Sequence, residues 1–251
     1  MTSSPIRFND NHISVNQLQM AYICNLLAYP LPLIEPYMRD VGFSHVALVG
    51  KGCKLDPTLV SALVERWRPK MHKFHLSCDE CTITLEDVQL QLELLVDGRV
   101  VTGSVHAADW RDVCDKLLRR VPEMIYGGRI EMGWLRRNFG GLDKDSTEIQ
   151  IEQHAQAYII QIIGCIQMSN KSRNLVHLRW LLKLVNFRKT DELNWGSTVL
   201  VTLYWEMCWA AQPWKIKIGG CMLLLQSWAR YRLPFLRPRA NYPCIFSLVT
   251  R

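Results

Sequence analysis

The chain has 251 residues, of which 49% are hydrophobic, 21% charged and 10% aromatic. This composition excludes collagen, coiled coil and low-complexity disorder, and it predicts a globular protein long enough to bury a core. The formal net charge is +7, but residues 1–150 hold 17 basic and 19 acidic side chains, whereas residues 151–251 hold 13 basic and 4 acidic ones. The positive charge therefore lies in the C-terminal part, where contact with a polyanion is expected.

The beginning of the chain lacks the pattern of a secretory signal. Residues 1–16 are polar and have no apolar core, so we expect a flexible N-terminus. The longest apolar runs are shorter than the ~18–20 uncharged residues that cross a bilayer, and we expect no contact with a membrane. Nine irregularly spaced cysteines indicate reduced thiols, as in the cytosol or the nucleus.

The first strong helix signals lie between residues 56 and 95. Asp56 and Pro57 are typical of a helix start, and the apolar spacing after them predicts a helix that ends near Arg68. Thr84 and Asp87 have the spacing of a capping box, which predicts a second, short helix with an apolar stripe.

Two short regions of the sequence predict β-hairpins. Residues 73–76 and 82–84 flank a polar turn and predict a hairpin. Residues 96–100 place an Asp-Gly pair between β-branched residues, which predicts a second hairpin.

The C-terminal half is expected to hold the core helices. A periodic apolar segment beginning near Asp145 predicts a long helix, and residues 198–211 and 218–231 are apolar on almost every side, which predicts helices enclosed by others. Five tryptophans lie in such apolar helical patterns and are expected in the core: Trp180, Trp195, Trp205, Trp209 and Trp228. The predicted fold is mainly α, a single helical domain over residues 17–239 with one or two small β-hairpins.

Four potential soft metal ligands follow at spacings of three: His72, His75, Cys78 and Cys81. Structural zinc sites normally separate two ligand pairs by a longer excursion, and ligands spaced by three along a strand point to alternating faces. The pattern therefore favours a hairpin with partly buried His and Cys over a zinc site.

Patterns that indicate catalysis or a cofactor are missing from the sequence. It has no Gly-x-Ser-x-Gly elbow, no phosphate-binding Gly-rich loop and none of the metal-binding Asp, His and Asn motifs of a phosphatase. We therefore expect neither an enzyme nor a cofactor.

The basic C-terminal part is a candidate surface for nucleic acid or a partner protein, because basic and aromatic residues alternate there. Its candidate contact residues are Arg179, Lys183, Arg188, Lys189, Lys215, Lys217, Arg230, Arg232, Arg237 and Arg239. The alternative is a solvated helical surface.

Several stretches together resemble the plant mobile domain family, also called maintenance-of-meristems-like or aminotransferase-like. They are residues 59–69, 72–76, 81–88, 96–99, 102–103, 134–135, 176–179, 195–197 and 218–221. The resemblance extends from about Asp56 to Arg239.

The resemblance implies a helical nuclear protein that acts in transposable-element silencing, gene regulation and meristem maintenance, with a phosphatase-7-like partner and contact with DNA or chromatin. It implies no aminotransferase chemistry, because the Lys-centred site and large two-domain body of a pyridoxal enzyme are missing. The alternative function is that of a transposon-encoded accessory protein that binds DNA through its C-terminal basic surface.

Within the resemblance, seven residues are expected to hold the architecture: Trp67, His75, Thr84, Asp87, Asp97, Gly98 and Trp134. Where the family usually has Leu-Gly-Leu-Pro, this chain has Glu93 and Leu95 in place of Gly and Pro, which predicts a longer helix there. After Arg239 the chain leaves the family pattern, so we expect residues 240–251 to form a divergent tail and the chain to be a truncated member.

Overall fold

A computed structural model describes residues 29–52, 55–77, 79–101, 109–167, 175–185, 193–212 and 218–236. The flexible N-terminus predicted for residues 1–16 and the tail predicted for residues 240–251 lie outside these ranges. Within them helices dominate and each strand has only two or three residues, which confirms the mainly α fold class.

Residues 32–92 form short helices and a small sheet. Its elements are η2 (Pro32–Ile34), α2 (Glu35–Asp40), α3 (Ser44–Gly52), α4 (Pro57–Arg66), β1 (Trp67–Arg68), β2 (Lys73–His75), β3 (Glu80–Cys81) and α5 (Leu85–Leu92). Strands β1, β2 and β3 form an antiparallel sheet with β2 in the middle. The hairpin predicted after residue 73 is confirmed, but its second strand is Glu80–Cys81 and not residues 82–84.

The chain from residue 99 onward contributes the longer helices. Its elements are β4 (Arg99–Val100), α6 (Trp110–Leu118), β5 (Arg129–Glu131), α7 (Met132–Asn138), α8 (Glu148–Ile162), η3 (Ile163–Gln167), β6 (Leu175–His177), η4 (Leu178–Lys183), β7 (Leu193–Asn194), α10 (Trp195–Ala210), α11 (Met222–Arg232) and η5 (Pro234–Leu236).

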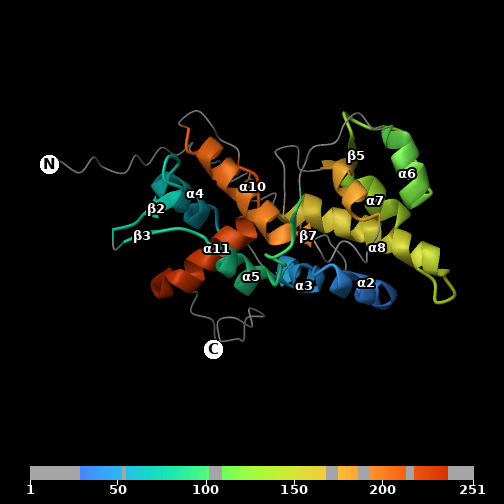
Figure 1. Cartoon of the computed structure of the whole chain (residues 1–251), viewed down its shortest axis with the longest axis horizontal. Coiled ribbons are helices and arrows are strands. Elements are labelled where there is room, and N and C mark those ends of the chain that lie inside the picture. Colours follow the sequence, from blue (N-terminus) through green and yellow to red (C-terminus); the bar gives the residue numbers. More distant parts are fainter. Residues whose placement is uncertain are drawn as a thin grey trace.

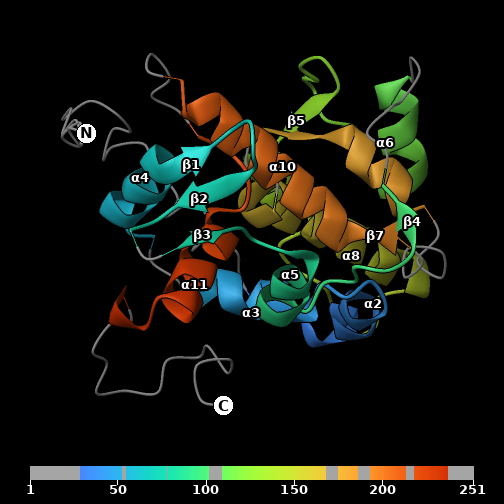
Figure 2. The same cartoon turned by 60° about the vertical axis from the view of Figure 1, so that its left-hand side comes forward.

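The elements gather at two ends of an elongated molecule (Figure 1). At one end α4 and the β1–β3 sheet lie beside α10, and α5 packs against both α10 and α11. At the other end α6, α7 and α2 pack against α8. Helix α10 runs from the sheet to β7 and so joins the two ends (Figure 2).

Side-chain caps explain where α4 and α5 begin. Asp56 accepts the backbone N–H groups of Thr58 and Leu59 before α4, as predicted. At the start of α5, the Asp87 N–H donates to Thr84 Oγ1 and the Thr84 N–H donates to Asp87 Oδ2. These reciprocal bonds confirm the predicted capping box, and they satisfy backbone donors that the first turn of a helix leaves free.

The end of α5 differs from the prediction. The helix ends at Leu92, and Glu93 takes a left-handed conformation with a φ of 53°. A left-handed residue closes many helices, and glycine adopts that conformation with least strain. The prediction of a longer helix is therefore wrong: Glu93 takes the backbone conformation that a glycine would take at the same position.

The second predicted hairpin is also wrong. Arg99 and Val100 form β4, which pairs in parallel with Leu193 and Asn194 of β7. The Asn194 side-chain amide also donates to the Val96 carbonyl. The Asp-Gly turn thus leads into a pairing between segments nearly a hundred residues apart, which a local turn signal cannot indicate.

The core joins aromatic residues from both halves of the chain. Trp195 meets Phe43 edge to face with ring centroids 5.3 Å apart, and Trp228 stacks on Phe74 at 4.9 Å. Both tryptophans are buried, as is Trp180, which confirms three of the five expected core tryptophans. No helix in the described ranges has both the length and the apolar composition needed to cross a bilayer.

Candidate interaction surface

Helix α10 carries an apolar stripe on its outer face. Val201, Trp205 and Trp209 recur at intervals of four residues, which places them on one side of the helix. Val201 is 66% exposed and Trp205 is 59% exposed. The Trp205 and Trp209 rings stack with centroids 5.8 Å apart. We call these three residues the α10 stripe.

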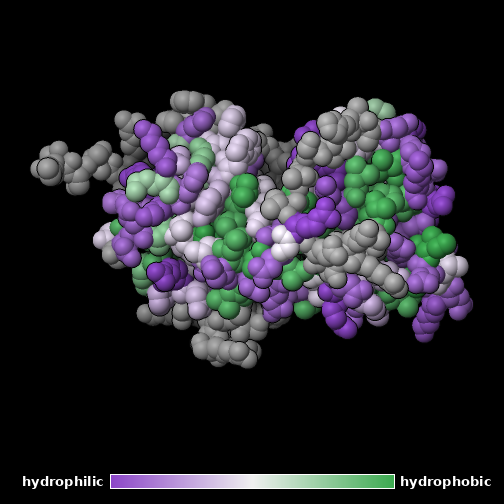
Figure 3. Space-filling model, viewed as in Figure 1, coloured by the Kyte–Doolittle hydropathy of each residue, from purple (hydrophilic) through white to green (hydrophobic). Residues whose placement is uncertain are grey.

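The exposure of Trp205 corrects the expectation that it lies in the core. Helix α10 is apolar on opposite faces, and its inner face, with Val199, Leu203 and Met207, already fills the core. In Figure 3 weakly polar and hydrophobic residues gather over α10, with strongly hydrophilic residues beside them. A surface helix normally turns charged residues to this side, so the stripe needs an explanation other than core packing.

An aromatic cluster holds α10 against the sheet. The buried Trp67 ring lies 4.9 Å from that of Phe74 and 5.0 Å from that of Tyr204, measured between centroids. Trp67 Nε1 donates to Cys208 Sγ, and the Tyr204 hydroxyl donates to the Ile83 carbonyl. Burial raises the pKa of Tyr204 above its ordinary value. These contacts fix the orientation of the stripe.

Three of the four candidate metal ligands fall in the described ranges, and each has another contact. His72 stacks on Tyr204 with centroids 5.6 Å apart, His75 Nδ1 lies 3.6 Å from Glu80 Oε1, and Cys81 sits opposite Phe74 in the sheet. Cys78 lies outside the described residues. No group of three or more His, Cys, Asp or Glu within those residues is placed to hold a metal ion.

The remaining residues expected to hold the architecture occupy varied positions. Trp134 meets Phe139 edge to face at 5.9 Å, and its carbonyl accepts from Asn138. Gly98 has a φ of 106° and sits with the exposed Asp97 in the turn before β4. His75 is exposed on the sheet, as is His72, so the predicted partial burial of these histidines is wrong, whereas Cys81 is partly buried as predicted.

The structure divides the described basic candidates between two places. Arg179 and Lys183 lie on η4, near β5, whereas Arg230 and Arg232 lie on α11 (Figure 1). The other six candidates lie outside the described residues: Arg188, Lys189, Lys215, Lys217, Arg237 and Arg239. The four described cations therefore belong to two separate sites.

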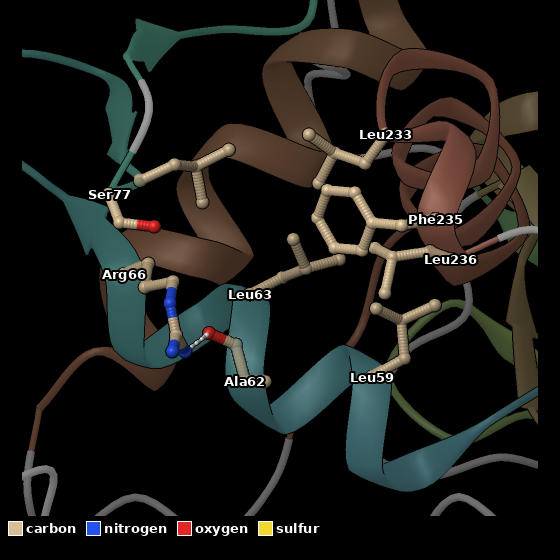
Figure 4. A pocket seen from close by; sticks show the side chains of 9 residues that line it. Leu59, Ala62, Leu63, Arg66, Ser77, Leu233, Phe235 and Leu236 are labelled. Carbon is tan, nitrogen blue, oxygen red and sulfur yellow. Dashed lines mark hydrogen bonds between the residues drawn. The ribbon is translucent and has the colours of Figure 1, made fainter.

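An apolar pocket lies between α4 and the end of α11 (Figure 4). It has a volume of about 240 Å³, and its walls include Leu59, Leu63 and Leu236. At its rim, Phe235 is 78% exposed and Arg66 Nη1 donates to the Ala62 carbonyl at 2.8 Å. The local sequence gave no signal for this pocket, because its walls come from segments about 170 residues apart.

The fold and the α10 stripe define a mainly helical domain with an apolar surface outside its core. The family profile of the plant mobile domain matches residues 42–248. The chain belongs to the plant mobile domain family, which confirms the resemblance seen in its motifs.

Three curated proteins of Arabidopsis thaliana illustrate the relationship. The chain is 41% identical over 213 residues to the serine/threonine-protein phosphatase 7 long form homolog, a match covering 84% of this chain and 16% of that protein. It is 38% identical over 204 residues to Protein MAINTENANCE OF MERISTEMS, covering 80% of this chain and 42% of that protein. It is 34% identical over 189 residues to Protein MAIN-LIKE 2, covering 74% and 28% respectively.

The chain thus spans less than half the length of each of these relatives. No solved structure matches the chain significantly.

Proposed function

We propose that this domain is a non-enzymatic interaction module of the nucleus, acting in transposable-element silencing, transcriptional regulation and meristem maintenance. In this proposal its partner is a phosphatase-7-like protein, and any phosphatase activity belongs to that partner. The single observation that supports binding as its role is the exposed α10 stripe.

The stripe has the chemistry of a protein-binding surface. Exposed apolar patches on globular proteins mark interaction sites, and tryptophan is enriched among the residues that dominate binding energy. The aromatic cluster beneath α10 holds the helix in place before any partner arrives, which lowers the entropy lost on binding.

The choice of partner and process is supported by the named relatives. In the phosphatase 7 long form homolog, the region similar to this chain is 16% of a longer polypeptide, so the domain shares a chain there with other sequence. The name of Protein MAINTENANCE OF MERISTEMS refers to a developmental process, the maintenance of meristems.

The test is capture of a purified Arabidopsis phosphatase-7-like protein by the full chain. We expect Trp205→Asp to weaken capture at least tenfold, because a carboxylate would be desolvated in an apolar interface. Ile149→Asp is the matched control, since Ile149 is 64% exposed on α8, away from the stripe. Equal capture by the wild type and Trp205→Asp would reject this surface, and exclusion of a fluorescent fusion from plant nuclei would reject the nuclear role.

A second candidate function is DNA binding by a transposon-encoded accessory protein. The observation that favours it is the net charge of residues 151–251, which hold 13 basic and 4 acidic side chains. In this case Arg237→Ala combined with Arg239→Ala should weaken DNA binding and flatten its dependence on salt. An unchanged salt dependence would count against it.

A further inference from the structure

Two arginines and a histidine meet where β5 pairs with β6. Arg129 is directly opposite His177 in the antiparallel register. Directly opposed residues project from the same face of a sheet. Arg179 follows two residues after His177, and its backbone N–H donates to His177 Nδ1 at 3.1 Å. We call Arg129, His177 and Arg179 the β5–β6 corner.

The two guanidinium groups form no salt bridge with any carboxylate among the residues that the structure describes. Within the described residues, neither Arg129 nor Arg179 forms an ion pair, and neither side chain donates a hydrogen bond. Arg179 Nε is buried without a hydrogen-bond acceptor, and its guanidinium lies 4.6 Å from the centroid of the Trp180 ring. A buried charged donor without an acceptor is unfavourable. The corner can therefore bind an anion that the described part of the chain does not supply.

The positive charges of the corner also act on one another. Burial and then the charges of Arg179 and Arg129 lower the pKa of His177 to about 4. Burial and the charge of Arg129 also lower the pKa of Arg179. The His177 ring is therefore neutral at pH 7, and because Nδ1 accepts a hydrogen bond, its proton is on Nε2.

The corner is held in place by a tight turn. Gly127 and Gly128 have φ angles of 56° and 78°, and Tyr126 and Arg129 exchange two backbone hydrogen bonds across them. The Leu178 N–H donates to the Gly128 carbonyl at 2.8 Å, which ties the turn to η4. These bonds fix the backbone from which the Arg129 and Arg179 side chains project, so the backbone loses little freedom when the corner binds an anion.

We propose that the β5–β6 corner binds a phosphate monoester carried by a phosphorylated segment of a protein partner. A phosphate monoester carries a charge of about −1.5 to −2 at pH 7, which matches two unpaired cations, and arginine binds it through charge-assisted hydrogen bonds. The proposal rests on the function as an interaction module and adds the chemistry that one of its surfaces recognises.

Nucleic acid fits the corner less well. Each backbone phosphodiester carries one charge, and proteins that bind single strands follow the backbone with a continuous positive groove. The described cations Arg230 and Arg232 lie on α11, at the other end of the molecule (Figure 1). Glu131, two residues along β5 from Arg129, is also exposed and interrupts a continuous positive track.

The test is a titration of the full chain, followed by nuclear magnetic resonance, with a pentapeptide that has phosphoserine at its centre and no other charged group. The unphosphorylated peptide and dimethyl phosphate, a diester with one charge, are titrated in parallel. We expect the phosphopeptide to bind at least tenfold more tightly than either, and its binding to raise the pKa of His177, because the phosphate neutralises the two arginines. Equal binding of the phosphorylated and unphosphorylated peptides overturns the proposal.

Matched variants locate the site. Arg129 is exposed, so Arg129→Ala should fold normally and lower phosphopeptide affinity about 10- to 100-fold. Glu131→Gln should strengthen binding, because it removes a negative charge from the same face of β5, whereas Arg137→Ala, an exposed arginine on α7, should leave binding unchanged. The proposal is overturned if Arg129→Ala binds the phosphopeptide as tightly as the wild type does. It is also overturned if a 20-nucleotide DNA binds through Arg129 more tightly than the phosphopeptide does.

The phosphate site and the α10 stripe are tested by different experiments. Phosphopeptide binding depends on Arg129 and is measured with purified chain, whereas partner capture is tested through Trp205. Loss of capture in Trp205→Asp together with unchanged peptide binding in Arg129→Ala rejects the phosphate site and keeps the interaction surface.

Discussion

The backbone N–H of Asp56 donates to the side-chain oxygen of Gln226 at 2.6 Å. Asp56 caps α4, and Gln226 is fully buried in the middle of α11. The bond therefore ties the first turn of one helix to the interior of another, 170 residues later in the chain. It also supplies an acceptor for a backbone donor that would otherwise be unsatisfied.

Replacing this acceptor should destabilise the fold. Gln226→Leu has nearly the same volume but leaves the Asp56 N–H without its partner, so we expect the free energy of unfolding to fall by about 1–3 kcal/mol. Urea unfolding measures the change. Gln89→Leu, on the exposed face of α5, is the control and should have little effect. Equal stability of Gln226→Leu and the wild type would contradict the role of this bond.

Glycine at position 93 should stabilise the protein. Glu93 has a φ of 53°, and a non-glycine residue in this conformation is strained by about 1–2 kcal/mol. Glu93→Gly relieves the strain and loses the exposed contact between Glu93 and His45, so we expect a net gain of about 0.5–1 kcal/mol in thermal or urea unfolding. Glu93→Ala loses the same contact and keeps the strain, so a gain of similar size in that variant would reject the explanation.

Two adjacent glycines should respond differently to alanine. A Cβ on Gly128 would lie 2.9 Å from both His177 Cε1 and the Trp110 indole, whereas a Cβ on Gly127 would meet nothing within 4 Å. Both residues have a positive φ, so both variants acquire backbone strain of about 1–2 kcal/mol. We expect Gly128→Ala to lose a further 1–3 kcal/mol through overpacking, as measured by urea unfolding. Identical losses in the two variants would contradict the close packing around Gly128.

The neutral state of His177 should appear in the pH dependence of stability. Its pKa in the folded protein is about 4, below the ordinary 6.5, so the unfolded chain binds more protons between these values. The free energy of unfolding therefore has its full value above pH 6.5 and falls as the pH approaches 4. The shift corresponds to about 3 kcal/mol, which solvent screening of the half-exposed ring reduces to about 1 kcal/mol.

The measurement is urea unfolding at pH 7.5 and 4.5 in the wild type and in His177→Asn. Asparagine can still accept the Arg179 N–H through its side-chain oxygen, so the start of η4 is preserved. We expect the wild type to lose about 1 kcal/mol more than the variant between the two pH values. Equal losses would show that His177 does not titrate as described.

Much of the local structure followed from the sequence because its causes are local. The caps at Asp56 and Thr84 act within one turn of helix, and the hairpin after residue 73 joins neighbouring strands. The motif resemblance was sufficient to identify the family. In each case, residues close in sequence carried the signal.

The sequence-based predictions that were wrong have a different origin. Glu93 closes α5 in a left-handed conformation that a non-glycine residue does not favour, and the next residue, Leu94, is buried. The segment containing Gly98 pairs with β7 across nearly a hundred residues. Trp205 has the same apolar neighbours in sequence as a core residue, yet it faces outward on α10.

The net charge of +7 and its concentration after residue 150 were properties of the sequence alone, as were the helical class and the family. The tertiary structure decided which of those charges act together. It placed Arg179 beside Arg129, a residue from the half of the chain that is nearly neutral overall, and it placed Arg230 and Arg232 elsewhere. The physical reason is that composition adds charges along the chain, whereas electrostatic interaction depends on distances in space, which the β5–β6 register and helix packing set.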